Sequence, residues 1–359
     1  MRVVIAAGGT GGHIYPGIAV GREILRRAVD SEVLFVGTAR GLETRIVPEN
    51  GFQLSLINSA GLKNVGFTGK VKGLALLSKS FLEARRVLRE FKPDVVVGAG
   101  GYVSGPVLMV ASWMKIPTLV MDSNALPGFT NRQLARFVDK AALTFPEAVP
   151  FFGSKGVLTG NPVRREFFDI EPKGKSAKLC ILIFGGSQGA RAINDAMIAA
   201  LPMLEAFRER IEITHQTGEA DFEKVSGAYL RGQWKESDIR PYISNMVGEF
   251  AKADVVICRA GATTCAELAA AGRPSIMIPL PTAADDHQRK NAEAMVAAGA
   301  AKMILQKDLN GERLAADIKA FLHDSSALTV MGCSAKTLGR GDAAEATVNL
   351  IESLAKRNV

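Results

Sequence analysis

The sequence has few cysteine, histidine and aromatic residues, and it contains no long apolar run. Its four cysteines show no Cys-x-x-Cys spacing and its four histidines form no cluster, so we expect reduced, mostly buried thiols and no structural zinc site. No run approaches the roughly 18 apolar residues that a membrane span needs, and the apolar stretch at residues 1–7 is too short for a signal sequence. We therefore expect a protein of the cytosol.

Two common nucleotide-binding motifs are also missing. The turn Gly8 to His13 does not fit the dinucleotide fingerprint, because Ile14 stands where a third glycine is needed, and residues 37–40, at the end of the next predicted strand, lack the ribose-binding acid. The run Gly174-Lys175-Ser176 is not a Walker loop, because Asp169 occupies its upstream glycine position. A nicotinamide enzyme and a phosphate-transferring ATPase are both disfavoured.

The length and the pattern predict two domains. A chain of 359 residues with 47% apolar composition can bury two cores of ordinary size. Predicted strands at residues 3–7, 33–36, 94–97 and 118–121 alternate with predicted helices at 14–27 and 103–114, which is typical of a parallel sheet with crossover helices. The alternation restarts with a strand at 179–184 and a helix at about 190–204.

The two halves also resemble each other internally, since the run from Asp94 to Asp122 is repeated in pattern from Asp254 to Asp286. We therefore predict two similar doubly wound lobes with their loops around one cleft. The predicted boundaries are a first domain at 1–159, a linker at 160–164, a second domain at 165–340, and a C-terminal segment at 341–359. The helix at about 343–356 in that segment is a candidate to pack back on the first domain.

The formal charge of +8 is unevenly distributed. Residues 61–92 contain eight Lys or Arg against two Glu, and Leu74, Leu76, Leu77 and Phe81 lie among them at spacings that can share a helix face. This pattern suits an anionic membrane surface or a nucleic acid, and it also suits a solvated amphipathic helix on its own domain. Because aromatic residues are sparse there, a nucleic-acid partner is disfavoured.

Four glycine-rich turns each follow a short apolar run directly. They are Gly8 to His13, Gly98 to Gly105, Gly185 to Gly189, and Arg259 to Thr264. A turn between a strand and a helix exposes backbone N–H groups and the positive end of the helix, so these turns predict a protein that binds phosphates or sugars in two places. His13 could accept a proton or merely cap its helix, and Ser187 could hold a phosphate oxygen or act as an ordinary N-cap.

Two polar segments of the second half add candidates. Glu267 lies one turn into the helix that follows Gly261 and could accept two ribose hydroxyls, or it could be a surface residue. The run 285–291 could read sugar hydroxyls through its amide and imidazole groups. Asp285, Asp286 and His287 could also hold Mg²⁺, although adjacent carboxylates tend to diverge.

Together these residues closely resemble the MurG family of N-acetylglucosaminyltransferases, over about residues 1–355. The motifs that carry the resemblance are Gly8 to His13 with Pro16-Gly17, Gly100 to Pro106, Gly160 to Arg164, Gly185 to Arg191, and the block Arg259 to Asn291. The resemblance implies the GT-B fold, an α/β architecture with two Rossmann-like lobes facing an interdomain cleft. It also implies transfer of N-acetylglucosamine from UDP-N-acetylglucosamine to the C4 hydroxyl of the muramyl sugar of lipid I, an undecaprenyl-diphosphate muramyl pentapeptide. The product would be lipid II for peptidoglycan synthesis.

The resemblance further implies where the substrates bind. The implied donor residues are Ile243 at the uracil, Glu267 at the ribose, Ser187 with Ala262, Thr263 and Thr264 at the diphosphate, and Gln288 at sugar hydroxyls, with Thr10, Gly11, Gly12, Asn124 and Arg164 completing the site. The acceptor is implied to lie near Gly8 to His13, Gly101 and Tyr102. Segment 61–92 would rest on the anionic inner leaflet, which implies a peripheral enzyme on the cytoplasmic face of the cell membrane.

One motif departs from the family pattern. The family commonly has His-Glu-Gln-Asn where this chain has Met121-Asp122-Ser123-Asn124, so Asn124 is kept and a shorter acid replaces Glu. We expect an inverting transfer with His13 as the catalytic base and Asp122 as the alternative base. Donors at the helix start near Gly261 would stabilise the departing UDP, and no metal or other cofactor is expected, since an Asp-x-Asp motif is missing.

Two other functions stay open from the residues alone. A sugar-nucleotide 2-epimerase would share the fold and the UDP-sugar site, but its typical carboxylate-rich centre is not evident. A non-enzymatic nucleotide-sugar-binding scaffold at the membrane would be expected to lack the catalytic candidates, and His13 and Gln288 are both present.

Overall fold

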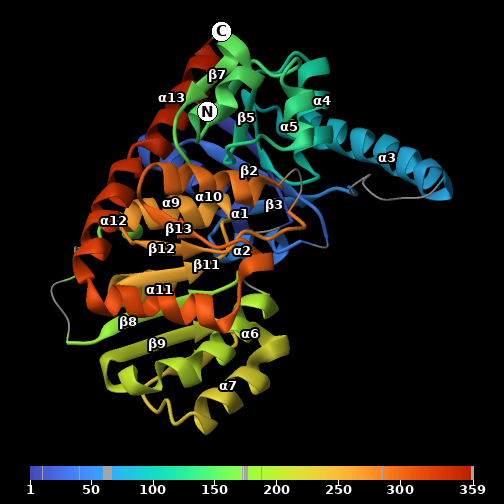
Figure 1. Cartoon of the computed structure of the whole chain (residues 1–359). Helices are drawn as coiled ribbons and strands as arrows, with labels where there is room; N and C mark the ends of the chain where they lie inside the picture. Colours follow the sequence, from blue (N-terminus) through green and yellow to red (C-terminus); the bar gives the residue numbers. More distant parts are fainter. Residues whose placement is uncertain are drawn as a thin grey trace. The chain divides into compact units, whose positions relative to one another are not determined.

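The computed structural model describes residues 1–9, 11–39, 41–59, 67–171, 173, 177–186, 188–283 and 286–356, with side chains described outside 67–77. The chain divides into two compact units, Met1–Val163 with Arg340–Val359, and Arg164–Gly339. Each unit is built on one parallel sheet (Figure 1). The C-terminal segment is therefore part of the first unit.

The first unit contains a seven-stranded sheet in the order β3-β2-β1-β4-β5-β6-β7. Its strands are β1 (Arg2–Ala7), β2 (Glu32–Gly37), β3 (Gln53–Leu56), β4 (Val95–Gly100), β5 (Thr118–Asp122), β6 (Lys140–Leu143) and β7 (Gly156–Leu158). Its α-helices are α1 (Gly11–Arg27), α2 (Glu43–Glu49), α3 (Phe67–Phe91), α4 (Ser104–Trp113), α5 (Phe129–Leu134) and α13 (Ala343–Ala355), with 3-10 turns at Pro146–Phe151 and Gly153–Lys155.

Helices cover both faces of this sheet, because the crossovers of a parallel sheet run over its faces, and successive strand residues point to opposite sides. On β1, Val3 and Ile5 pack with α1 and α13, whereas Val4 and Ala6 pack with α3 and α4. Arg27 of α1 fixes α13 in place by donating hydrogen bonds to the Asn349 Oδ1 at 2.7 Å and to a Glu352 carboxylate oxygen at 3.2 Å. The last helix thus belongs to the apolar layer that α1 forms on one face of the sheet.

The second unit contains a six-stranded sheet in the order β10-β9-β8-β11-β12-β13. Its strands are β8 (Leu179–Phe184), β9 (Ile211–Gln216), β10 (Asp238–Arg240), β11 (Val255–Cys258), β12 (Ser275–Met277) and β13 (Ala301–Met303). Its α-helices are α6 (Arg191–Ala200), α7 (Phe222–Arg231), α8 (Met246–Lys252), α9 (Ala262–Ala271), α10 (His287–Ala297), α11 (Gly311–His323) and α12 (Ser325–Leu338). Its 3-10 turns are Arg165–Phe167, Leu201–Arg210, Glu219–Asp221 and Gln306–Asp308.

The two strand orders are the same in plan. In each sheet the first strand, β1 or β8, lies between the second strand on one side and the fourth on the other, and the chain direction of the crossovers reverses there. Ligands of doubly wound sheets bind beyond the carboxyl ends of the strands at this switch point. The switch points are β1/β4 in the first unit and β8/β11 in the second, and all four glycine turns follow these four strands.

Two local predictions need correction. The helix expected at 14–27 begins at Gly11, so Gly11 and Gly12 form its first turn. The helix expected over 190–204 ends at Ala200, and residues Leu201–Arg210 continue as a 3-10 helix with Pro202 near its start. Proline has no N–H for an α-helical hydrogen bond, which accounts for the change of helix type. The prediction of a helix in the basic segment is fulfilled by α3, part of which lies outside the described side chains.

Candidate active site

The switch point of the first unit brings two glycine turns into contact. Gly8 and Gly9 follow β1, while Gly100 ends β4 and Gly101 follows it, with φ of 123° and 81°, a region that favours glycine. A Cβ atom on Gly101 would overlap the backbone of Gly8. Glycine at these positions therefore allows the two turns to pack directly against each other.

His13 lies in the first turn of α1, at the exit from the Gly8 turn. Its half-buried imidazole packs against Gly100, where an added Cβ would come within 2.8 Å of the ring Cε1. Tyr102 is 62% exposed, and its backbone carbonyl accepts a hydrogen bond of 2.9 Å from the Ser59 hydroxyl. The structure thus brings His13 and Gly101 to one switch point, whereas Thr10 lies outside the described residues.

Asp122 ends β5 and is buried, with 4% of its surface exposed. Its Oδ1 accepts the Asn124 N–H at 2.9 Å, and its Oδ2 accepts the Gly128 N–H at 3.1 Å and the Asn131 side-chain amide at 2.8 Å. Burial raises the pKa of the carboxyl, and the hydrogen bonds oppose this shift. Both oxygens are occupied in holding the loop that carries Asn124.

In the second unit, the turn after β8 packs on the end of β9. Gly189 has φ of 74°, and an added Cβ would overlap the Thr217 carbonyl. Gln216 lies beneath this turn with 1% of its surface exposed. Its Nε2 donates to the Gly186 carbonyl at 2.9 Å, while its Oε1 accepts the Ile243 N–H at 2.8 Å. One amide side chain thus joins the glycine turn to the segment of Ile243; Ser187 lies outside the described residues.

A buried neutral histidine supports the same turn from behind. His215 contacts the Tyr229 hydroxyl and the Asn194 Oδ1, both at 3.1 Å, and burial lowers its pKa to about 3. Asn194 in turn donates to the Thr217 carbonyl at 3.0 Å. This network holds residues 215–217 against the turn.

The turn after β11 leads into α9, whose first residues are Ala262, Thr263 and Thr264. Glu267 lies one turn further along, with its side chain 13% exposed, and its Oε1 is 3.6 Å from the Arg164 guanidinium. Burial raises the pKa of Glu267 to about 7, and the nearby Arg164 moderates that shift. Arg164 also lies over the Phe167 ring at 4.8 Å. Arg164, expected in the linker, therefore lies in the second unit beside Glu267.

Two further contacts fix the polar run at the start of α10. Asn291 is fully buried and donates to the Ala260 carbonyl at 3.2 Å, which ties α10 to the turn before α9. The Gln288 Oε1 accepts the Leu280 N–H at 3.0 Å, so the side-chain amide of Gln288 is held against the segment that follows β12. The start of α10 is thus bonded to the turn before α9 through Asn291 and to the segment after β12 through Gln288.

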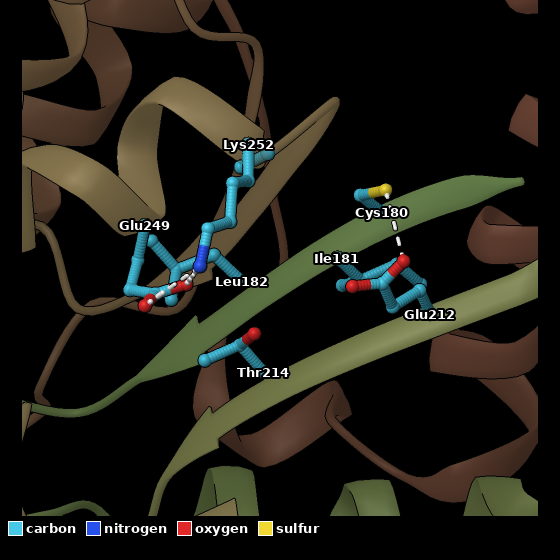
Figure 2. Close-up of a pocket in the computed structure, with 8 residues that line it drawn as sticks. Cys180, Ile181, Leu182, Glu212, Thr214, Glu249 and Lys252 are labelled. Atoms are coloured by element: carbon cyan, nitrogen blue, oxygen red, sulfur yellow. Dashed lines mark hydrogen bonds and ion pairs between the residues drawn. The ribbon is translucent and has the colours of Figure 1, made fainter. Parts of the chain in front are cut away.

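A metal cluster and a surface recess are the remaining kinds of candidate site. Within the ranges given above, no three His, Cys, Asp or Glu side chains gather to hold a metal ion, and Asp285, weighed as a magnesium ligand, lies outside those ranges. Figure 2 shows a recess between β8, β9 and α8, bordered by Cys180, Glu212 and Lys252. Its volume of about 10 Å³ has room for a single water at most, so it is no substrate site. No helix in the described part of the chain is long and apolar enough to cross a bilayer.

Comparisons with known proteins bear directly on this arrangement. The glycosyltransferase family 28 N-terminal domain matches residues 3–143, and the glycosyltransferase family 28 C-terminal domain matches residues 180–346. A protein of Anaeromyxobacter sp. (strain Fw109-5) is 47% identical over 360 aligned residues, covering 99% of this chain and 94% of the relative. It is named UDP-N-acetylglucosamine--N-acetylmuramyl-(pentapeptide) pyrophosphoryl-undecaprenol N-acetylglucosamine transferase. The chain belongs to the MurG branch of glycosyltransferase family 28.

Solved structures agree with this membership. The crystal structure of Acinetobacter baumannii MurG matches with a TM-score of 0.78 and 32% identity, covering 98% of this chain and 99% of that one. The two parallel-sheet units are those of the GT-B fold, as predicted. A UDP-N-acetylglucosamine 2-epimerase structure from Listeria monocytogenes, described as putative, matches with a TM-score of 0.73 at 15% identity, over 99% of this chain and 97% of that one. At that identity the likeness is one of fold alone.

Two residues of these family domains escaped the sequence analysis. Gln216 stands at the end of β9, and Glu43 stands at the start of α2, both far in sequence from the turns that they contact. No strand is predicted from the sequence at 211–216, and Glu43 lies well beyond the strand predicted at 33–36, so neither residue carries a local signal. Such residues become candidates once strand order is known, because that order shows which strand ends are neighbours.

Proposed function

We propose that this chain transfers N-acetylglucosamine from UDP-N-acetylglucosamine to the muramyl sugar of lipid I and so makes lipid II for peptidoglycan synthesis. The observation that carries the proposal is 47% identity across 99% of the chain to an enzyme named for this transfer. The matched switch points of the two units support it, since each places glycine turns where doubly wound sheets bind ligands.

The second unit is the proposed donor domain. Ile243 would meet the uracil, Glu267 the ribose hydroxyls, and the turn at 185–189 with the start of α9 the diphosphate. The positive end of α9 and its first N–H groups suit an anion, and Thr263 and Thr264 add hydroxyl donors. Gln288 is proposed at the sugar hydroxyls.

The first unit is the proposed acceptor domain, with Gly11, Gly12, Gly101 and Tyr102 around the muramyl sugar. His13 is the proposed base. It takes the proton of the C4 hydroxyl as that oxygen bonds to the anomeric carbon, the bond from that carbon to the UDP oxygen breaks, and the configuration inverts. Donors at the start of α9 stabilise the negative charge that develops on UDP, so the proposal needs no metal.

Asp122 is better suited to positioning than to proton transfer. A base must reach the hydroxyl that it deprotonates, but both Asp122 oxygens are buried and accept hydrogen bonds from residues 124, 128 and 131. Its proposed contribution is to hold the loop of Asn124. This assignment leaves His13 as the base.

A peripheral position on the cytoplasmic face of the cell membrane is proposed for α3 and its surroundings. Lys79, Arg85, Arg86 and Arg89 are exposed on α3, and Leu82 among them is 69% exposed. Trp113, 59% exposed at the end of α4, lies 5.2 Å from the Phe81 ring. Exposed apolar and aromatic groups within a basic surface suit the headgroup region of an anionic bilayer. The opposite side of α3, with Ala84 and Leu88, packs on the sheet.

One assay tests the proposal. The protein is mixed with labelled UDP-N-acetylglucosamine and a lipid I analogue, and the label is followed into lipid. Transfer to lipid supports the proposal. Conversion of the sugar nucleotide without acceptor would instead identify a 2-epimerase, and binding without turnover would identify a scaffold.

A further inference from the structure

Glu43, the first residue of α2, is a fully buried carboxylate beneath the Gly8 turn. Its Oε2 accepts the Gly9 N–H at 2.9 Å, and its Oε1 accepts both the N–H and the hydroxyl of Thr38 at 2.8 Å. All three partners donate, which is the bonding pattern of an ionised carboxylate. The side chain therefore links the end of β2 to the turn after β1.

The surroundings of Glu43 are shaped to hold it. An added Cβ on Gly8 would come within 2.8 Å of the carboxylate Oε1, and Cβ atoms on Gly37 or Gly41 would also overlap the side chain. The Leu42 N–H donates to the Gly9 carbonyl at 3.3 Å, so both backbone groups of Gly9 are bonded to residues 42 and 43. Three glycines thus leave room for the Glu43 side chain, and two hydrogen bonds hold the turn against residues 42 and 43.

The equivalent turn of the second unit is held differently. There the neutral amide of Gln216 donates to the Gly186 carbonyl, whereas in the first unit an anion accepts from the Gly9 amide. In the first unit the turn leads into α1, and His13 is the third residue of that helix. Its ring packs on Gly100. Displacement of Gly9 would therefore displace the base.

We propose that Glu43 is a positioning residue for the transfer reaction, which fixes the Gly8 turn so that His13 meets the acceptor hydroxyl. The inference rests on the proposed function for its effect on turnover. Its effect on the turn itself can be measured separately. A misplacement of about 1 Å at a reacting group can lower a rate on the order of a hundredfold.

The test compares Glu43→Gln with Glu49→Gln, an exposed position on the same helix. Glutamine keeps the shape but must face either Gly9 or Thr38 with an amide that cannot accept their hydrogen bonds. We expect Glu43→Gln to lower kcat at least tenfold, to leave the Kd for UDP within twofold, and to speed amide hydrogen exchange at Gly9. Exchange in residues 185–218 should stay unchanged, and Glu49→Gln should behave as wild type in every measurement.

Each other result has a distinct meaning. A kcat within twofold of wild type, or unchanged exchange at Gly9, would overturn the inference. Equal losses in kcat and UDP affinity with faster exchange in both units would show a general loosening of the fold and would overturn it as well. If Glu43→Gln does not unfold cooperatively, Glu43→Asp, which keeps the charge but shortens the reach, carries the same expectations. Absence of transfer by wild type would refute the proposed function, while the exchange measurement would still decide whether Glu43 fixes the turn.

Discussion

The backbone N–H of Ile243 donates a hydrogen bond of 2.8 Å to the side-chain oxygen of Gln216. The same side chain donates to the Gly186 carbonyl, so one buried amide sets the spacing between two segments of the second unit. In the proposed donor site these segments meet the uracil and the diphosphate. We therefore expect Gln216 to set the distance between the proposed uracil and diphosphate contacts.

Gln216→Leu should weaken donor binding. The substitution leaves the buried Ile243 N–H without its partner, which costs about 1–3 kcal/mol, and it also removes the hydrogen bond to the Gly186 carbonyl. We expect the Kd for UDP, measured by calorimetry, to rise at least tenfold. Gln53→Leu, at an exposed position on β3, is the control. An unchanged Kd in a Gln216→Leu protein that unfolds cooperatively would show that the two Gln216 hydrogen bonds do not shape the donor site.

His13→Ala should abolish turnover while UDP affinity stays nearly unchanged. The imidazole is the proposed base, and it belongs to the first unit, whereas the proposed contacts at the uracil and the ribose, Ile243 and Glu267, belong to the second. A positioned base commonly contributes on the order of 10²- to 10⁴-fold to a rate. The measurements are steady-state transfer to a lipid I analogue and calorimetric titration with UDP. A variant with near wild-type kcat would exclude His13 as the base.

Binding of UDP-N-acetylglucosamine should weaken as the pH falls below 7. Burial raises the pKa of Glu267 to about 7, and only the ionised carboxylate can accept both ribose hydroxyls. The proton must leave before the ligand binds, so we expect the Kd to rise by up to about tenfold per pH unit between pH 7 and pH 5.5. The effect on the unliganded protein has the opposite sign. Its folded state holds this proton more tightly than the unfolded chain does, so Glu267 costs stability as pH rises from about 4.5 through 7.

The matched variants for this titration are Glu267→Gln and Glu223→Gln, the latter exposed on α7. Glu267→Gln should bind weakly at pH 8 and lose most of the pH dependence, whereas Glu223→Gln should keep the wild-type curve. A wild-type pH dependence in Glu267→Gln would show that another group titrates.

The double variant Leu82→Ser with Trp113→Ser should bind membranes less tightly. Each exposed apolar side chain contributes about 1–2 kcal/mol when it enters the bilayer interface. We therefore expect the affinity for phosphatidylglycerol vesicles, measured by co-sedimentation, to fall at least tenfold. Leu230→Ser is the control, because Leu230 is 81% exposed but belongs to α7 of the second unit. Equal binding by both variants would place the docking surface elsewhere. Added salt should weaken wild-type binding, since the surrounding lysines and arginines are exposed.

Much of the fold could be predicted from local patterns. The strand at 179–184 is observed with those bounds, because an apolar run between a polar segment and a glycine turn marks both of its ends. The helix end predicted near residue 204 was wrong, since apolar periodicity continues past Ala200 while Pro202 changes the hydrogen bonding. The glycine turns can be recognised from the sequence because positive φ and close backbone approach favour glycine at these positions.

The supports of the site could not be found in the same way. Glu43 lies 34 residues from the Gly9 amide that it accepts, and Gln216 lies 30 residues from Gly186. No periodicity links residues at such separations, because the pairing depends on which strands are neighbours in the sheet. The partners of Asp122 could not be predicted either, since the donors at residues 128 and 131 reach it only through the folded loop.

The position of α13 has a consequence for synthesis of the chain. Val348, Ile351 and Leu354 belong to the core that β1, α1 and β4 begin, so that core is incomplete until the last helix has left the ribosome. All residues of the second unit, 164–339, are available earlier. The nascent chain therefore reaches a stage at which its later domain can be finished while its earlier domain still exposes an unpaired apolar face. A chaperone that binds apolar surface would meet the first unit at that stage.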